Sequence, residues 1–191
     1  MSSEDFGKYY DLEKYLFGEV SPTFKLSGNL STFDFFCIVV WKANRAKSKI
    51  ARRMLSHGFT NLEDAVATLM GQVHQAVDEK ERLRLLIQKW GFRLPMASAI
   101  LTVLYPHNFT VYDVRVCEML DDFHHLQYKV DFEALWSGYS QYVQRVRKCG
   151  PENISLREKD RWFWGKSFAN NLLRDIENKF MHNSVKNGDD A

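Results

Sequence analysis

Hydrophobic residues recur at helical spacing along most of the chain, and the two-residue alternation typical of a half-buried strand is nearly absent. The only strand candidate is the short apolar run at residues 110–112. Helices are expected over residues 3–15, 33–45, 46–57, 61–70, 78–90, 94–104, 113–120 and 131–147 and from 155 onward, with loops at 17–31 and 121–129. The pattern therefore predicts an all-α protein with short loops.

The apolar pattern is densest in the middle of the chain. A very apolar helix is expected to open at Leu94 and Pro95 and to end before Pro106. Residues 109–112 then cross in an extended form, and Asp113 stands at the start of the next helix, where its carboxylate can accept from free backbone N–H groups. A carboxylate held this rigidly suits a catalytic acid or base, and it equally suits an ordinary N-cap.

Size and composition place few demands on the fold. A chain of 191 residues fits one domain or two closely packed lobes, and it can bury roughly 70% of its unfolded surface without a disulfide or a metal. No apolar run approaches the ~20 residues of a membrane span, and the N-terminus lacks the pattern of a signal peptide. Cys37, Cys117 and Cys149 are odd in number and widely spaced, so we expect buried thiols and a cytoplasmic protein.

Charge is distributed unevenly, although the formal net charge is only +2. No acidic residue occurs from Phe35 to Leu62, and six cations fall within this stretch. They are Lys42, Arg45, Lys47, Lys49, Arg52 and Arg53. Such a segment either forms a solvated basic face or contacts phosphate groups.

Tryptophans offer candidates for stacking as well as for the core. Trp41, followed by Asn44 and Arg45, could stack on and hydrogen-bond a flipped base, or it could be buried. Trp90 precedes the turn at 91–93 and could either stack on a base or pack the turn. The remaining three tryptophans are expected in the core. They are Trp136, Trp162 and Trp164.

A metal site is not expected from the histidines. His124 and His125 lie beside Asp121 and Asp122, but adjacent histidines cannot easily face one ion from a helix. We therefore expect neither a metal nor another cofactor.

The stretch GFRLPMASAILTVLYPHNFTVYDVRV, residues 91–116, resembles the helix-hairpin-helix DNA glycosylase superfamily, especially its adenine-glycosylase and endonuclease III branches. In that family a hairpin runs into an Ala-rich helix, a loop follows, and a catalytic Asp starts the next helix. Residues 97–101 match the helix, and residues 109–113 match the approach to the Asp without a gap. A weaker resemblance extends over residues 33–165.

The resemblance implies a two-lobed helical fold in one compact domain at 33–182, with a helix and loop at 1–32 packed on it and a frayed tail at 183–191. Asp113 would stabilise a developing oxocarbenium sugar and orient the attacking water. Contacts to nucleic acid would come from Lys42, Asn44, Arg45, Lys47, Lys49, Arg52, Arg53, Gly91, Arg93 and Arg115.

The chain also departs from the family pattern. Arg93 takes the place of the second hairpin glycine, where it could contact a phosphate or lie in solvent, and Arg115 could hold a phosphate or pair with Asp113. Pro95 takes the place of the lysine that strand-cutting lineages use, and the iron–sulfur cysteines are missing beyond Cys149.

These features together predict a monofunctional N-glycosylase that acts on double-stranded DNA. It is expected to need no metal ion and to have no membrane as a partner. The alternative is a non-catalytic module on the same helical scaffold that binds nucleic acid or another protein. The sequence does not indicate the oligomeric state.

Overall fold

The computed structural model describes residues 5–180, and within that range the chain is helical and forms no strand. The α-helices are α1 (Leu12–Tyr15), α2 (Ser21–Ser27), α3 (Thr32–Ala43), α4 (Lys47–Leu55), α5 (Leu62–Gln75), α6 (Glu79–Arg84), α7 (Leu94–Leu104), α8 (Val114–Leu120), α9 (Phe132–Lys148) and α10 (Leu156–Glu177). The shorter turns are 3₁₀ at η1 (Phe6–Tyr9), η3 (Asn44–Ala46) and η5 (His124–Tyr128), and π at η2 (Leu16–Val20) and η4 (Leu85–Lys89). The predicted all-α class is confirmed.

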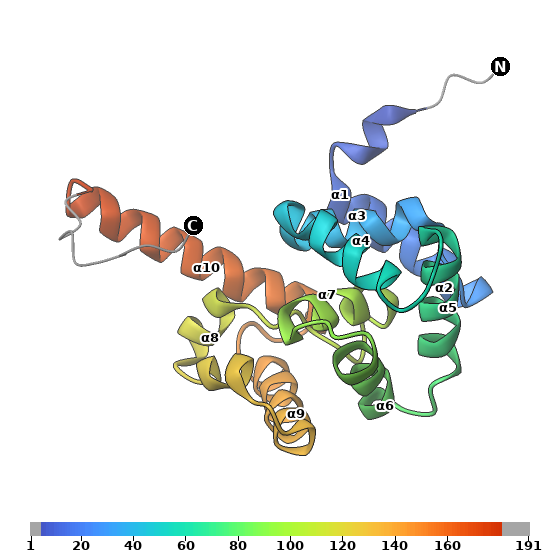
Figure 1. Cartoon of the computed structure of the whole chain (residues 1–191). Helices are drawn as coiled ribbons and strands as arrows, with labels where there is room; N and C mark the ends of the chain where they lie inside the picture. The colour runs from blue at the N-terminus through green and yellow to red at the C-terminus, as the bar shows by residue number, and fades with distance from the viewer. Residues whose placement is uncertain (1–4, 181–191) are drawn as a thin grey trace.

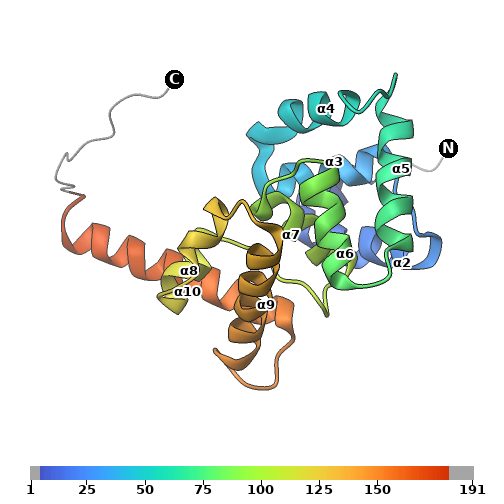
Figure 2. The same ribbon diagram turned by 60° about the horizontal axis from the view of Figure 1, so that its bottom comes forward.

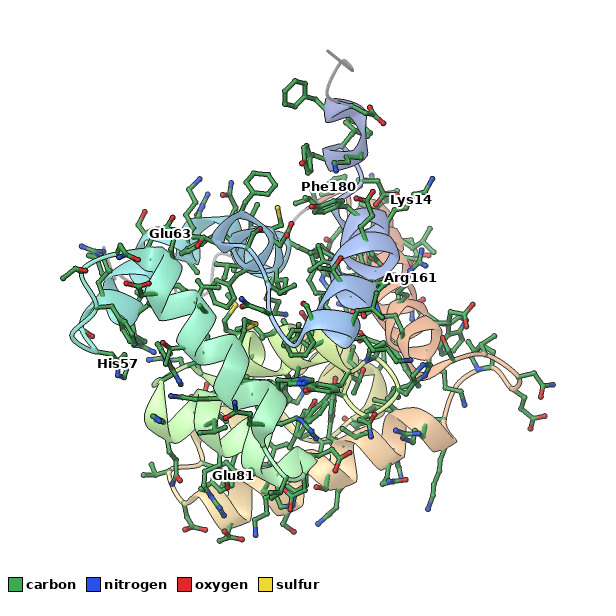
Figure 3. The ribbon with its side chains drawn as sticks, turned by 90° about the vertical axis from the view of Figure 1, so that its right-hand side faces the viewer. Lys14, His57, Glu63, Glu81, Arg161 and Phe180 are labelled. Atoms are coloured by element: carbon green, nitrogen blue, oxygen red, sulfur yellow. The ribbon has the colours of Figure 1, made fainter. Side chains whose placement is uncertain are left out.

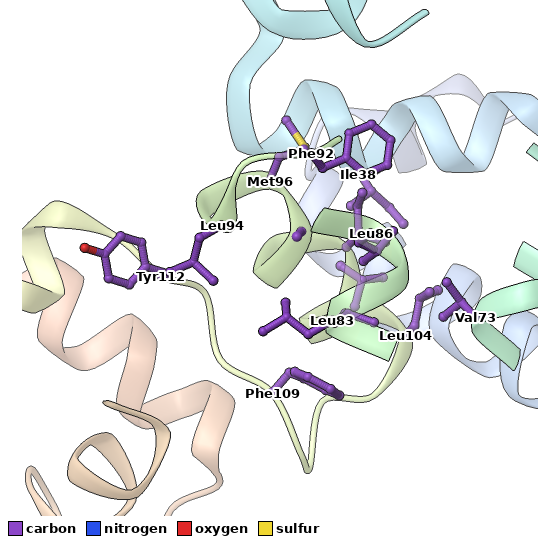
Figure 4. Packing of buried hydrophobic residues seen from close by; sticks show 14 of the residues in the cluster. Ile38, Val73, Leu83, Leu86, Phe92, Leu94, Met96, Leu104, Phe109 and Tyr112 are labelled. Atoms are coloured by element: carbon purple, nitrogen blue, oxygen red, sulfur yellow. The ribbon is translucent and has the colours of Figure 1, made fainter. Parts of the chain in front are cut away.

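Helix α7 forms the centre of the core. Every residue from Met96 to Leu104 is buried, because apolar or small side chains occupy all of its faces. Leu86, Phe92 and Phe109 pack around it from the segments on either side (Figure 4). The helix has no exposed face to carry polar groups.

The other helices lie on two sides of α7. Helices α3, α4 and α5 lie on one side, and α8, α9 and α10 lie on the other (Figures 1 and 2). Helix α8 packs along α10, and the C-terminal half of α10 extends beyond the rest of the described chain in both views. The segment that links α7 to α8 therefore passes from one group of helices to the other.

This linking segment, residues 109–113, is extended and largely buried without a neighbouring strand. Its backbone groups form hydrogen bonds with side chains instead. The hydroxyl of Tyr139 donates to the carbonyl of Thr110 (2.7 Å), and that of Tyr142 donates to the carbonyl of Val111 (2.8 Å). The N–H of Tyr112 donates to Oγ of Ser98 (2.8 Å). Since unpaired buried backbone groups are costly, these side chains make the buried crossing possible.

Polar side chains cap the starts of several of the helices. Ser31, Asn61, Asp113 and Asp131 each accept a backbone N–H in the first turn of the helix that follows. Ser155 forms a reciprocal capping box at the start of α10. The helices expected from residues 61, 113, 131 and 155 therefore begin one residue after those positions, which are their caps.

The predicted loop at 17–31 is wrong. Helix α1, the π turn η2 and α2 follow one another directly through Ser27, and Gly28 ends them in the left-handed conformation with φ of 67°. Pro22 lies in the first turn of α2, immediately after the π turn. A wider turn at this point accommodates a residue that has no N–H to donate.

Other expectations concern the cysteines, membrane spans and the tail. Cys37 and Cys117 are buried, and burial raises the pKa of both thiols to about 11, so they stay protonated, whereas Cys149 is partly exposed. None of the helices in residues 5–180 is long and apolar enough to cross a membrane. The frayed tail expected at 183–191 lies outside the described residues, as does the start of the helix expected from residue 3.

Truncation of α7 tests its place in the core. Leu101 is fully buried, so Leu101→Ala should lower the free energy of unfolding by roughly 2–5 kcal/mol in a denaturant titration. Leu26→Ala, at an exposed position of α2, is the matched control and should change it by less than about 0.5 kcal/mol. A decrease below that value for Leu101→Ala would contradict the central position of α7.

Candidate active site

A pocket with convergent polar groups lies where α1, the end of α3, the linking segment and α10 meet. Its volume is about 450 Å³, within the ~300–1,000 Å³ of small-molecule sites. The lining includes three carboxyl groups and three cationic groups, together with two tryptophans. These residues are Glu13, Asp113 and Asp160, Lys42, Arg157 and Arg161, and Trp41 and Trp164, with Val111 beside them.

Asp113 is fixed at the pocket by both of its carboxylate oxygens. Oδ1 accepts the backbone N–H of Arg115 (3.1 Å) in the first turn of α8, and Oδ2 lies 2.6 Å from Nζ of Lys42 at the end of α3. The Asp113 side chain is 20% exposed and that of Lys42 is 16% exposed. The carboxylate is thus rigid and still accessible from the pocket.

Arg157 connects three helices behind the pocket. Nη2 lies 3.0 Å from Oε1 of Glu13 on α1, and Nη1 contacts Oδ2 of Asp160 one turn along α10. The guanidinium also lies over the rings of Phe17 and Trp41, at 5.1 and 5.0 Å from their centroids. Arg157 therefore holds the end of α3 against α1 and α10.

A second ion pair joins α1 and α10 at the rim of the pocket. Nε of Arg161 lies 3.2 Å from Oε1 of Glu13, so that one carboxylate of α1 receives two guanidinium groups. Figure 3 shows Arg161 beside the helix that carries Lys14. Arg161 is more exposed than Arg157 and borders the pocket from the solvent side.

Asp160 is the most deeply placed carboxyl of the pocket, with 3% of the residue exposed. Burial raises its pKa from 3.8 to about 6, and the nearby carboxylate of Asp113 acts in the same direction. The guanidinium of Arg157 and the ammonium of Lys42 oppose this rise. Asp160 therefore exchanges its proton in a pH range where an ordinary aspartate is fully ionised.

The two tryptophans of the pocket, Trp41 and Trp164, provide apolar surfaces on different helices. Trp41 is half-buried on α3, whereas Trp164 on α10 is 44% exposed and Trp162 is also exposed. Placing Trp162 and Trp164 in the core was therefore wrong, because the buried positions of α10, Leu156, Asp160, Phe163 and Ser167, lie on one face of the helix and both tryptophans lie outside it. Trp136 is partly buried against the core, as expected.

Arg115 stacks beside the pocket and does not contact Asp113 through its side chain. Its guanidinium lies 5.1 Å from the ring centroid of Trp164 and 5.8 Å from that of Phe168. These two rings are parallel, with centroids 5.7 Å apart and an interplanar angle of 6°. The aromatic surface thus continues from the pocket along α10.

The residues of the basic segment divide into two sets. Lys42 points into the pocket, whereas the others follow on η3 and α4. Asn44, Arg45, Lys47, Lys49 and Arg52 are exposed, and Arg53 is partly buried. Nη1 of Arg53 donates to the carbonyl oxygen of Gly91, so this side chain is hydrogen-bonded to the turn before α7.

The turn itself places Gly91 and Arg93 at the surface and Trp90 inside. Gly91 is exposed with φ of 68°, the left-handed conformation for which glycine is best suited, and Arg93 is exposed just before α7. Trp90 is 2% exposed, and its Nε1 donates to Oε1 of Gln72 (3.0 Å). The interpretation of Trp90 as a base-stacking residue is therefore wrong, because its ring is buried and packs on that of Phe59.

The arrangement combines two carboxyl groups in unequal environments. Asp113 has an ammonium partner and a backbone donor, whereas Asp160 is desolvated. Such a pair can keep negative charge on one group while the other exchanges a proton. Within residues 5–180, no three or more His, Cys, Asp or Glu residues are grouped so as to hold a metal ion.

Sequence reasoning found Asp113, Lys42 and Trp41 and missed the contribution of α10. Arg157, Asp160, Arg161 and Trp164 lie at positions i, i+3, i+4 and i+7, which share one face of a helix. That spacing was visible in the sequence. Glu13 left no comparable signal, because its role depends on the packing of α1 against α10.

The pKa of Asp160 predicts a pH dependence of stability. Its folded value of about 6 lies above its ordinary value, so its contribution to stability is present below about pH 4 and is lost as pH rises through 6. Asp160→Asn removes this titration. From pH 4 to 7 the native protein should lose on the order of 2–3 kcal/mol relative to the variant. Denaturant titrations that stay parallel across this range would contradict the prediction.

Comparison of the chain with protein-family models, with curated proteins and with solved structures yields no match. The resemblance of residues 91–116 to the glycosylases therefore remains an expectation drawn from those residues. The case for a function depends on the pocket and the surfaces around it.

Proposed function

We propose that the protein binds double-stranded DNA and hydrolyses an N-glycosidic bond in it, with Asp113 as the carboxylate that acts on the sugar. Cleavage of this bond places positive charge on the sugar ring, and a fixed negative group beside it lowers the barrier. The same group can orient the water that attacks C1′. The chemistry needs one accessible carboxylate and no cofactor.

The observation that carries this proposal is the position of Asp113. Its carboxylate is held by a backbone N–H and by Lys42, and it lines a pocket whose apolar surfaces are Trp41 and Trp164. A base extruded from a duplex needs aromatic surfaces to stack on and polar groups for its edges. Asp160 and Arg157 are such polar groups within the same pocket.

The surroundings of the pocket support DNA as the ligand. The exposed cations of η3 and α4 begin only a few residues after Lys42, so a basic surface starts near the pocket. Gly91 and Arg93 lie at the surface of the turn before α7, and Arg53 is bonded to that turn. Phosphate contacts from these positions would set a duplex beside the pocket.

A two-lobed architecture of the glycosylase type is part of this proposal. The position of α7 between the two groups of helices, with the linking segment passing beside the pocket, supports it (Figure 1). In such an arrangement the ligand enters between the groups and meets Asp113 at the start of α8.

A second candidate is a non-catalytic module that binds another protein. Large apolar side chains are exposed along the projecting part of α10. They are Phe168, Leu172, Leu173 and Ile176. Exposed apolar residues in such number favour an interaction surface. In this candidate the Lys42–Asp113 pair is structural, and the protein releases no base.

Asp113→Asn separates the two candidates. Asparagine is a good N-cap and keeps the size of the side chain, but it leaves the largely buried ammonium of Lys42 without its carboxylate, so the free energy of unfolding should fall by up to about 3–5 kcal/mol. The charge near the sugar is removed, and base release should therefore be abolished while DNA affinity stays equal or increases. The measurement is base release from a panel of labelled damaged and mismatched duplexes, with thermal melts of both proteins.

Native protein that melts cooperatively, binds duplex and releases no base from any member of the panel would rule out the glycosylase. Asp131→Asn is the matched control, since Asp131 caps α9 away from the pocket. It should release base at the native rate.

Neutralisation of the exposed cations of α4 tests the DNA surface. Changing Lys47, Lys49 and Arg52 to glutamine should make the slope of log affinity against log salt less steep by about 0.9 for each phosphate that these side chains neutralise. The matched control changes Lys129, Arg145 and Lys148, three exposed cations near the two ends of α9, and should leave the slope unchanged. Equal slopes in all three proteins would show that α4 is only a solvated face.

A further inference from the structure

Helix α10 has two faces that differ in their surroundings. On the first face Leu156, Asp160, Phe163 and Ser167 are buried at helical spacing, and α8 packs along it. The hydroxyl of Ser167 donates to Oε2 of Glu118 on α8 (3.0 Å), so this face stays occupied into the middle of the helix. The face on the opposite side of the helix has a different composition.

The opposite face carries a stripe of apolar and small residues, here called the outer stripe. Its members are Gly165, Ala169, Leu172 and Ile176, in steps of four, three and four residues. Such steps keep side chains in line along a helix and are typical of a seam between two helices. Ala169, Leu172 and Ile176 are exposed, and the stripe runs into the half of α10 that extends beyond the rest of the described chain (Figure 1).

The outer stripe is complementary in size to a second copy of itself. An antiparallel register that sets Ala169 opposite Leu172 of the second copy also sets Gly165 opposite Ile176 of the second copy. A small residue then meets a large one at every level. A Cβ built on Gly165 would have no atom within 4 Å, so the single chain leaves room there for a side chain from outside.

Charge selects the same arrangement. Lys166 and Glu177 are exposed and border the outer stripe on the same edge, about three turns apart. Equal edges face each other when two helices pack antiparallel, so Lys166 comes within reach of Glu177 of the second copy, and the contact occurs twice by symmetry. A parallel pair would leave these two residues about three turns apart and unable to meet.

The ends of the chain that lie outside the described residues do not have the composition to cover this surface. Residues 1–4 and 181–191 contain only three large apolar side chains, those of Met1, Met181 and Val185. Phe168 and Leu173, both exposed, widen the apolar surface beside the outer stripe. A second copy supplies apolar side chains over the same length and in a matching pattern.

We propose that two copies of the chain associate through the outer stripes of α10, packed antiparallel about a two-fold axis between positions 170 and 171. The contact covers about 18 Å of helix on each copy, so a reversible dimer of modest affinity is expected. The inference depends on neither candidate function. It does remove the support that the exposed residues of α10 give to the second candidate, since a second copy would cover them.

Sedimentation equilibrium of the full chain tests the dimer. Between low and high micromolar concentration the average mass should rise from that of one chain, 22.4 kDa, toward twice that value. Leu172→Lys sets an ammonium against Ala169 of the second copy and should hold the protein at the mass of one chain. Because Leu172 is exposed, its thermal melt at low concentration should stay close to native. Val77→Lys, at an exposed position between α5 and α6, is the matched control and should dimerise as the native protein does.

Reversal of the two charges tests the antiparallel register. Lys166→Glu and Glu177→Lys each set like charges against each other, and each variant alone should dimerise roughly tenfold more weakly than the native protein. An equal mixture of the two variants should form a heterodimer in which both contacts again join opposite charges. Its affinity should return to the native value.

Native protein that keeps the mass of one chain at every concentration would overturn the inference and leave the outer stripe to a different partner. A dimer that survives Leu172→Lys, or a mixture of charge variants that stays as weak as its components, would equally refute the proposed contact. The outcome is separate from base release. A protein of single-chain mass that releases base loses only the dimer, and a dimer that releases none loses only the glycosylase.

Discussion

The structure depends on one buried length of extended backbone, residues 109–113. Helices satisfy their own hydrogen bonds, but an extended segment in an interior must find partners elsewhere. Tyr139 and Tyr142 of α9 and Ser98 of α7 provide them. Burial raises the pKa of both tyrosines, so their hydroxyls stay protonated and remain donors. The segment delivers Asp113 to the start of α8 in a fixed position, and the pocket is arranged around that position.

Features set by neighbouring residues could be predicted from the sequence. The capping residues Asp113, Asp131 and Ser155 act within one turn of their own helix, so local pattern was sufficient. Local pattern also misled at residues 17–31, where Gly18 and Pro22 indicate breaks that do not occur. The energy of packing Leu16, Val20 and Phe24 into the core outweighs those propensities.

Features set by distant residues could not be predicted. Trp90 and Trp164 have similar local contexts, and only the packing of other helices decides that the first is buried and the second exposed. Lys42 belongs by sequence to one basic segment, but the turn at Ala43 separates it from α4. The burial of Asp160 likewise depends on distant residues, because Arg157 holds α1 and α3 against α10 beside it.

The way in which the linking segment is bonded also bears on association between chains. An extended segment whose N–H and C=O groups face solvent offers an edge to which another chain can add a strand. Residues 109–112 are buried, and the carbonyls of Thr110 and Val111 are already bonded to tyrosine hydroxyls. In the folded state this apolar, β-prone stretch is therefore protected from intermolecular pairing, and it becomes an aggregation-prone element only when α9 detaches.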